Sequence, residues 1–410
     1  MASPVNSTYV RKTNRQKVLK QIRSSAGISR QELAERIGLT PPAISGIVRD
    51  WLTKKVLKEE GYAESGGGRR PVRLVLDGNA ALVIGAELSR QQIRISITDL
   101  KGEILSQQEW NLDMSDPYVG IHEFGKKLND FLRNSPFSNH LILGLGVAAG
   151  GLYDYQNRRI QRSVNLGKMW DNLEIVRLLE AEFSLPIRVE NNAKACALAE
   201  YWLMQKEEIA DLAWIHLGEG ISAGLIQKGE WVRGRSNYSG ELGHISLVSD
   251  GELCNCGNQG CLEAYWGWKG IKNRLHKEGF FEKSKVNMQA FRMKDWQKFL
   301  ETESDLGRQM SGEMSRDVGK VASQLINLLN PSHIFLGGPT VQTLRNSLGS
   351  LLEVVQKEAF PEVARETAIS VSQMTSYAGS LGGCALILRE VFQNPESEIF
   401  GLLEGEPIRE

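Results

Sequence analysis

The 410-residue sequence lacks the features that define several large classes of protein. No apolar run approaches the roughly 18 residues that a membrane-spanning helix needs, and the first residues contain no apolar signal core. We therefore expect a cytoplasmic protein with no membrane partner. Five cysteines are too few for a disulfide framework in a chain of this length. With 41% hydrophobic and 24% charged residues, disorder over the whole length is excluded, and two or three globular domains are expected.

The sequence also has no net charge, but this balance conceals two oppositely charged parts. Residues 1–76, the head, contain 15 Lys and Arg against 6 Asp and Glu, whereas the remaining body contains 34 basic and 43 acidic residues. A basic head on an acidic body favours nucleic acid as a partner of the head. Charge alone is equally compatible with a basic surface that has no partner, so the motifs within the head must decide.

The head has the sequence pattern of a winged helix-turn-helix domain. Apolar residues at helical spacing predict three helices, over about 13–24, 30–37 and 41–53. Ser29 is the expected N-cap of the second helix, with Glu32 at the capping-box position, and Gly38 is expected to end it. Thr40 then caps the third helix, whose first turn contains a proline. A helix, a short glycine-containing turn and a second helix are typical of DNA-binding proteins.

The third helix is the expected recognition helix. Its inward side chains are predicted to be Ile44, Ile47, Val48 and Leu52. Small, hydroxyl-bearing and basic side chains on its other face can approach base edges or phosphates closely. The predicted DNA contacts on this helix are Thr40, Pro42, Ser45 and Arg49.

A two-stranded wing is predicted after the third helix, from strands over 56–60 and 71–76. The connection between them is glycine-rich and ends in Arg69 and Arg70, which could reach a phosphate backbone or a narrow minor groove. A hairpin with solvated arginines would explain the wing alone. The combination of helix pair and basic wing favours DNA binding.

The body follows an α/β pattern that occurs twice. Strands are expected at 82–88, 92–99, from 102 onward and at 141–147, with a helix near 122–134. Similar strands recur at 211–217, 221–226 and 333–336, with a helix near 312–330. Two similar lobes around a cleft would explain this duplication. We expect a first lobe over 80–200, completed by the C-terminal helix 378–395, and a second over 201–377 that carries a cluster of cysteines and the dimer contacts.

Three cysteines lie close together in the second lobe, and their spacing indicates a metal site. Cys254 and Cys256 are separated by one residue, Cys261 follows five residues later, and His244 lies ten residues upstream. Three thiolates and one imidazole form a closed tetrahedral zinc site, which is structural rather than catalytic. Buried free thiols are the alternative. The other two cysteines, Cys196 and Cys384, stand among apolar residues and are expected in the core.

The body resembles the ROK family (repressor, open reading frame, kinase), which is built on the actin/hexokinase-like fold. The resemblance runs from about residue 11 to 395 and is carried by the motifs at 144–150 (GLGVAAG), 189–193 (VENNA), 217–221 (LGEGI), 239–244 (SGELGH) and 254–263 (CNCGNQGCLE). The fused head resembles the repressor branch, and residues 9–15 are most similar to xylose-type repressors. The resemblance implies zinc at the four positions above. It also implies sugar-hydroxyl contacts from Asn165, Asn191, Asn192, Glu241, His244 and Glu263.

Two departures from the family kinases predict that the body binds a sugar without phosphorylating it. Residues 85–92 follow the first strand but lack the glycines that admit phosphate to the backbone. The family kinases use an aspartate as general base where this chain has Asn192, and an amide cannot take up the hydroxyl proton. ATP is therefore not an expected cofactor.

We interpret the sequence as a sugar-responsive transcriptional repressor. It is expected to bind a palindromic operator as a homodimer, or as a tetramer, because helix-turn-helix proteins usually pair over two half-sites. A monosaccharide would favour one degree of closure of the lobes and so change operator affinity. Two alternatives remain open: a sugar kinase with a DNA-binding head, and a repressor controlled by a protein partner.

Overall fold

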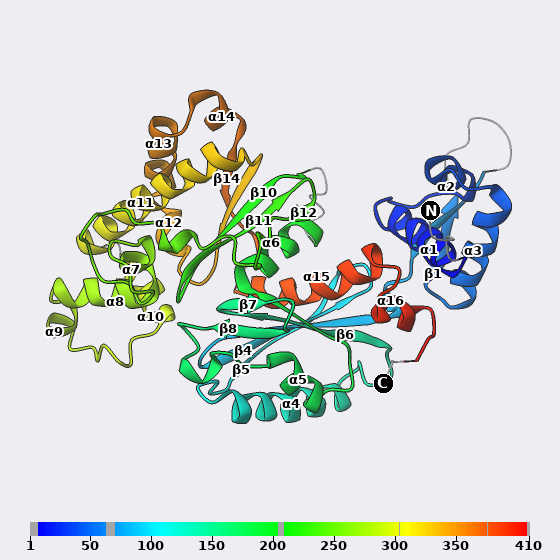
Figure 1. The fold of residues 1–410 in the computed structure, drawn as a ribbon, viewed down its shortest axis with the longest axis horizontal. Coiled ribbons are helices and arrows are strands. Elements are labelled where there is room, and N and C mark those ends of the chain that lie inside the picture. The colour runs from blue at the N-terminus through cyan, green and yellow to red at the C-terminus, as the bar shows by residue number, and fades with distance from the viewer. Residues whose placement is uncertain (1–6, 63–69, 204–208, 303, 375, 408–410) are drawn as a thin grey trace. The chain divides into compact units, whose positions relative to one another are not determined.

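The structure is a computed structural model that describes residues 7–62, 70–203, 209–302, 304–374 and 376–407 (Figure 1). The chain forms two compact units. Unit 1 takes in the described residues up to Ala148, Ile175–Val189 and those from Gly383 onward, and unit 2 takes in Ala149–Glu174 and Glu190–Gly382. No helix in these described ranges has both the length and the apolar character needed to cross a membrane.

The head is a winged helix-turn-helix, as predicted. It consists of α1 (Ser7–Arg23), α2 (Arg30–Ile37), α3 (Pro41–Thr53), β1 (Leu57–Tyr62) and β2 (Val72–Leu76), and the two strands pair antiparallel. The capping box of Ser29 and Glu32 is present, and Gly38 ends α2 with a left-handed φ of 74°. Helix α1 begins six residues earlier than predicted. Residues 7–12 belong to the helix but have no apolar stripe from which it could be predicted.

The core of the head differs from the prediction on α3. Ile44 and Val48 are buried as expected, but Ile47 and Leu52 are only half-buried. Trp51 is fully buried in their place. The predicted inward set was therefore wrong by a small rotation of the helix, and the large indole decides which face turns inward, because it buries the most apolar area.

The Ser29→Ala variant is expected to destabilise the head by about 1 kcal/mol at neutral pH, since it removes a side-chain acceptor from a helix N-terminus. The Ser29 backbone N–H and hydroxyl hold the pKa of Glu32 below its usual value. A lowered folded-state pKa contributes stability above the unfolded pKa, and this contribution is lost as pH falls through the folded value. Thermal unfolding at pH 7 and about pH 3 should therefore show a larger deficit at pH 7.

Unit 1 contains the first of two five-stranded sheets. Its strands are β3 (Leu82–Leu88), β4 (Gln92–Asp99), β5 (Ile104–Asn111), β6 (Ile142–Ala149) and β9 (Ile187–Asn191), in the order β5-β4-β3-β6-β9. The associated helices are α4 (Pro117–Arg133), α5 (Ile175–Glu182), α15 (Ala378–Gln393) and α16 (Glu398–Leu403). Every residue of β3 is buried, which indicates a strand covered on both faces.

Unit 2 contains a second sheet with the same plan. Its strands are β10 (Leu212–Leu217), β11 (Ile221–Gln227), β12 (Glu230–Trp231), β13 (His333–Gly337) and β14 (Ala368–Val371), in the order β12-β11-β10-β13-β14. Strand β10 pairs antiparallel with β11 and parallel with β13. In both sheets an antiparallel hairpin extends on one side of the first strand and two later strands extend on the other. The expected duplication of an α/β lobe is confirmed.

The helices of unit 2 and the small elements complete the described fold. The helices are α6 (Asn192–Trp202), α7 (Leu262–Trp266), α8 (Trp268–Lys277), α9 (Phe280–Ser284), α10 (Met293–Glu301), α11 (Asp305–Leu329), α12 (Gln342–Arg345), α13 (Leu348–Glu358) and α14 (Pro361–Glu366). The short elements are β7 (Leu152–Asp154), β8 (Arg159–Arg162), η1 (Gly78–Ala80), η2 (Lys168–Trp170) and η3 (Leu242–His244). As expected, Cys196 and Cys384 are fully buried.

The observed division differs from the expected boundary near residue 200. Residues 149–174 and 190–200 belong to unit 2, because α6 packs on β10 and β11 rather than on the first sheet. Helix α15 is divided between the two units: its residues up to Gly382 belong to unit 2, and those from Gly383 onward belong to unit 1. A Cβ on Gly382 would lie 2.5 Å from the backbone carbon of Ala195 on α6, and one on Gly383 would lie 2.3 Å from the Gly146 carbonyl oxygen on β6.

Candidate metal centre and ligand site

The turn at residues 239–244 is pinned to β11, and this contact requires glycine. The Ala223 N–H donates to the Gly240 carbonyl oxygen at 2.6 Å. Gly240 has a φ of 92°, and a Cβ there would lie 1.9 Å from the Ala223 carbonyl oxygen. Only glycine fits a left-handed backbone at such a close approach. The turn leads directly into η3, which places Glu241 at its start and His244 at its end.

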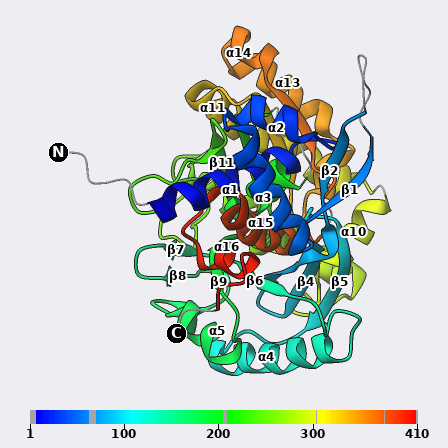
Figure 2. The ribbon, with the colours of Figure 1, turned by 90° about the vertical axis from the view of Figure 1, so that its right-hand side faces the viewer.

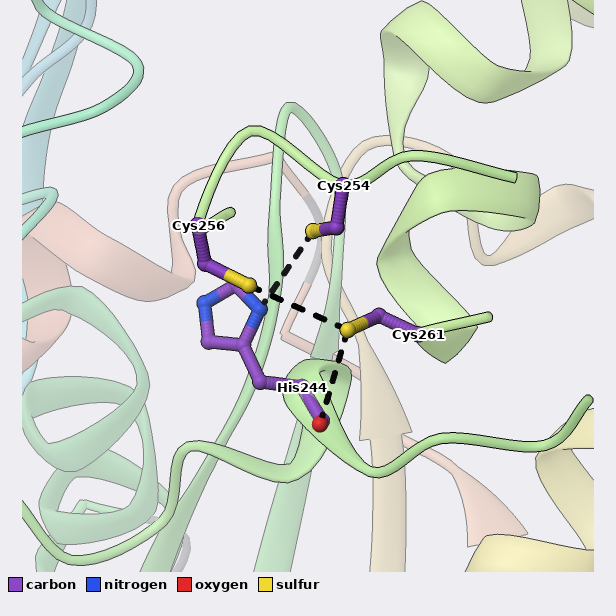
Figure 3. Close-up of side chains that lie close together, drawn as sticks. All are labelled: His244, Cys254, Cys256 and Cys261. Atoms are coloured by element: carbon purple, nitrogen blue, oxygen red, sulfur yellow. Dashed lines mark hydrogen bonds between the residues drawn. The ribbon is translucent and has the colours of Figure 1, made fainter. Parts of the chain in front are cut away.

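The four predicted metal ligands converge in space (Figure 3). The ligand atoms of His244, Cys254, Cys256 and Cys261 all lie within 4.8 Å of one another. The Cys254 Sγ is 3.7 Å from the His244 Nδ1, and the Cys256 Sγ is 3.8 Å from the Cys261 Sγ. Zn–S bonds of about 2.3 Å in a tetrahedron require S–S separations of about 3.8 Å. The donor set and its spacing therefore fit a metal ion.

The thiols need a cation to ionise together. Burial and the neighbouring thiols raise the pKa of Cys261 to about 12, and burial also raises the pKa of Cys254. Protonated thiols are poor ligands, so metal binding must release their protons. The knuckle that gathers them is tight: Gly260 has a φ of 74°, and a Cβ there would lie 1.8 Å from the Val248 carbonyl oxygen.

The ring of His244 joins the cysteine cluster to a carboxylate. Its Nδ1 faces the Cys254 thiol, while its Nε2 lies 3.7 Å from the Glu241 Oε2. A metal on Nδ1 would thus fix the ring and leave Nε2 directed at Glu241. Burial raises the pKa of Glu241, and the nearby His244 and Lys194 oppose this shift.

A second carboxylate and an amide converge on the turn between β10 and β11. The Glu263 Oε2, on the first turn of α7, accepts from the Ile221 N–H at 2.8 Å. A Cβ on Gly220 would lie 2.7 Å from both the Asn165 Nδ2 and the Glu263 Oε2. Burial raises the pKa of Glu263. Asn165 and Glu263 are therefore brought together, although they are far apart in the sequence.

The two asparagines of the VENNA motif have different places. Asn191 is the N-cap of α6: its Oδ1 accepts from the Ala193 N–H at 3.0 Å, and its Nδ2 donates to the Gly151 carbonyl oxygen at 3.0 Å. Both ends of the Asn191 amide are thus engaged by backbone partners. Asn192 is the first residue of α6 and is half-buried.

Sequence reasoning missed a buried ionic network next to these asparagines. Glu190 is 1% exposed, and its Oε2 accepts from Arg233 Nη1 at 2.7 Å. Asn237 donates from Nδ2 to the Glu190 Oε1 at 3.0 Å, and its carbonyl oxygen accepts from the buried Lys194. Burial lowers the pKa of Lys194, and Glu190 and Glu241 oppose this shift. Asn237 has a left-handed φ of 64°. No local sequence motif predicted its place in this network.

The predicted DNA contacts lie on the surface of the head, where the structure describes them. Thr40, Pro42 and Arg49 are exposed, and Ser45 is half-buried. Arg70 is exposed shortly before β2. Arg69 lies outside the described residues.

The stretch at residues 85–92 forms a tight hairpin between β3 and β4. The Ser89 N–H donates to the Gln92 carbonyl oxygen at 3.0 Å. Leu88 is buried and Arg90 is exposed. Glu87 is buried 3.7 Å from Arg94, and burial raises its pKa.

Comparison with known proteins shows that the chain belongs to the ROK family, whose profile matches residues 83–390. A winged helix-turn-helix DNA-binding profile matches residues 11–50. Both matches confirm the family and the head predicted from the sequence.

Two transcriptional regulators are similar in sequence to almost the whole chain. The xylose repressor of Caldicellulosiruptor bescii is 25% identical over 397 residues, which cover 95% of this chain and 99% of the relative. The DNA-binding transcriptional dual regulator NagC of Escherichia coli is 25% identical over 387 residues, or 94% of each chain. A crystal structure of a ROK family transcriptional regulator, a homologue of the E. coli MLC protein, aligns with a TM-score of 0.80 at 22% identity. That alignment covers 97% of this chain and all of the other, and it confirms the fold.

Proposed function

We propose that this protein is a sugar-responsive DNA-binding repressor. The observation that carries the proposal is the presence, in one chain, of a winged helix-turn-helix and a set of carboxylates, amides and imidazole gathered around a candidate metal centre. Relatives named as a xylose repressor and as the regulator NagC span nearly the whole chain and support it.

In this proposal the metal is zinc, and its role is structural. His244, Cys254, Cys256 and Cys261 would hold it, and four protein ligands leave no open position for catalysis. When bound, zinc supplies a fixed cross-link between η3 and the start of α7. Glu241 precedes and Glu263 follows that cross-link, so both carboxylates keep a set separation.

The same residues would bind the sugar. Carboxylates such as Glu241 and Glu263 can accept from two hydroxyls at once, and the Asn165 amide can donate and accept. Nε2 of His244 completes the set, Asn192 adds a second amide, and Asn191 holds the start of α6 in place. Asn192 cannot act as a general base, so the bound sugar would leave unchanged, and ATP would have no role.

The head, residues 1–76, would bind the operator as part of a homodimer, since winged helix-turn-helix proteins usually bind two half-sites. Thr40, Pro42, Ser45 and Arg49 would face the major groove, and Arg69 and Arg70 would reach the backbone or minor groove from the wing. The remaining residues would form the two lobes. A cytoplasmic location follows from this role.

The proposal is tested by selecting a DNA sequence from a random pool with the full-length protein and then titrating sugars. Xylose, glucose, mannose and N-acetylglucosamine are each added with and without Mg-ATP. We expect one sugar to change operator affinity by fivefold or more, in line with couplings of about 1–3 kcal/mol, and ATP to have no effect. ATP consumption with a sugar would favour the kinase alternative. Operator binding that no sugar alters would favour control by a protein partner.

The Arg49→Met variant is expected to weaken operator binding: about equally on all DNA sequences if Arg49 contacts phosphate, and mainly at one base position if it contacts a base edge. If the contact is to phosphate, the slope of log affinity against log salt falls by about one. Arg133→Met removes the same charge from an exposed position on α4 and serves as the control. Equal affinities of parent and Arg49→Met would contradict the assigned recognition face.

A further inference from the structure

A short helix in unit 1, α16, contacts both the head and the first sheet (Figure 2). Toward the sheet, Arg188 on β9 donates from Nη1 to the Glu398 Oε1 at the start of α16, at 3.1 Å. Toward the head, Glu404 directly after α16 accepts from the Arg15 Nε on α1. Lys54, directly after α3, donates to the Glu404 carbonyl oxygen at 2.9 Å. The two ends of one six-residue helix are thus tied to different parts of the unit.

The contact with the head is buried and combines charge with aromatic packing. Trp51 and Phe400 are both fully buried, with ring centroids 6.2 Å apart in an edge-to-face arrangement. The Arg15 side chain is 4% exposed, and its guanidinium lies 4.4 Å from the Trp51 ring centroid. Glu404 is 11% exposed. Exposed ion pairs contribute little to the free energy of unfolding. Removing one member of a buried pair is strongly destabilising, because the other charge stays buried without its partner.

The contact reaches the recognition helix itself. Asp50 and Trp51 lie on α3 and directly follow Arg49, and Asp50 accepts from the Arg15 Nη2 at 2.5 Å. Burial opposes ionisation of Asp50, but hydrogen bonds and charges from Arg15 and Lys54 outweigh it, so its pKa lies below its usual value. The end of α3, α1 and α16 therefore share one charge-paired cluster.

We propose that α16 positions the recognition helix for the operator and carries the state of the body to it, with Phe400 and Glu404 as positioning residues. This inference rests on the proposed function. A helix held in its binding orientation loses less entropy on binding than one that moves on a tether. Without the α16 contacts, the head is held by the short segment after β2 and by contacts from α1 to α15, in which Gln16 donates to the Val391 carbonyl oxygen and Arg23 lies over the Phe392 ring. These contacts do not involve α3, so operator binding becomes both weaker and independent of the sugar.

The test compares Glu404→Gln and Phe400→Ala with the parent, all as full-length proteins, on the DNA that the parent selects. We expect operator affinity to fall about tenfold or more in each, since preorganisation is lost while no DNA contact is removed. Simple electrostatics predicts the opposite sign for Glu404→Gln, because deleting a carboxylate reduces repulsion from DNA. The slope of log affinity against log salt should remain unchanged, since no phosphate contact is lost. Glu396→Gln makes the same charge change at an exposed position eight residues earlier and should match the parent.

A second readout separates positioning from simple loss of fold. Zinc content and sugar affinity without DNA should equal those of the parent, whereas the sugar-dependent ratio of operator affinities should fall close to one. Amide hydrogen exchange over residues 41–53 should accelerate in both variants. Glu404→Gln keeps the side-chain shape, so it remains informative if Phe400→Ala fails to fold.

The outcomes are distinct. Variants that fold and match the parent in operator affinity and exchange over α3 would overturn the positioning role. If the parent selects no DNA sequence, both the proposed function and this inference are contradicted. If the parent binds an operator but no sugar changes its affinity, the sugar response of the proposed function fails, while operator affinity and hydrogen exchange still decide the positioning role of α16.

Discussion

Under the proposed function, the Cys261→Ser variant is expected to lose its zinc and most of its sugar affinity. Cys261 is one of four convergent ligands and also the residue from which α7 starts. Without the metal, the His244 ring loses its link to the thiols, and the spacing of Glu241 and Glu263 depends on backbone hydrogen bonds such as that from the Leu262 N–H to the Ile245 carbonyl oxygen at 3.0 Å. Removal of the residues that orient metal-binding side chains typically lowers metal affinity or activity 10- to 100-fold. By analogy, we expect sugar affinity to fall by at least about tenfold.

Zinc content of the purified protein and a thermal-shift titration with the effector sugar measure this effect. A ligand that binds only the folded state raises the unfolding midpoint, so a loss of affinity appears as a smaller shift at the same sugar concentration. Cys196→Ala removes a thiol that is buried outside the cluster and should keep both zinc and sugar response. A zinc-free Cys261→Ser protein that binds the sugar like the parent would refute the proposed role of the metal.

The Arg233→Met variant is expected to destabilise unit 2 by about 3–5 kcal/mol, because it leaves the Glu190 carboxylate buried and without its cation. Glu190 is 1% exposed, and the Arg233 Nη1 lies 2.7 Å from its Oε2. The guanidinium also lies 4.3 Å from the Trp231 ring centroid, so packing is lost together with charge. Urea unfolding monitored by tryptophan fluorescence measures the change in the free energy of unfolding.

Two further variants identify the cause of that loss. The double variant Glu190→Gln with Arg233→Met should recover part of the stability, since no buried charge then lacks a partner. Arg308→Met breaks a pair whose acid, Asp305, is fully exposed, and it should leave the free energy of unfolding almost unchanged, because water screens the pair. If Arg233→Met costs as little as Arg308→Met, the network is not a stabilising element of the site.

Much of the fold could be predicted because its signals are local. The capping box of Ser29 and Glu32 spans four residues, and strands such as β6 consist entirely of apolar residues and glycine. The cysteine cluster could be predicted for the same reason, since its four members lie within 18 positions. These features need no knowledge of distant segments.

The missed features all join distant segments. Glu404 meets Arg15 across 389 positions, and Glu190 meets Arg233 across 43. A charged residue in the sequence reads as a solvated surface group unless its partner is known, so neither buried network had a sequence signal. The burial of Trp51 has the same origin, because its neighbour Phe400 lies at the other end of the chain.

The number of residues in helix α15 is constrained, because this helix leads into α16 and sets its position and rotation. It begins in unit 2, passes Gly382 and Gly383, and ends in unit 1 shortly before α16. Each residue of a helix advances the chain by about 1.5 Å and turns it by about 100°. One inserted residue in α15 would therefore turn α16 away from Arg15 and Lys54, whereas an insertion of seven residues would nearly restore its phase but displace it by about 10 Å. Chimaeric regulators should therefore exchange the head together with residues 378–407 rather than the head alone.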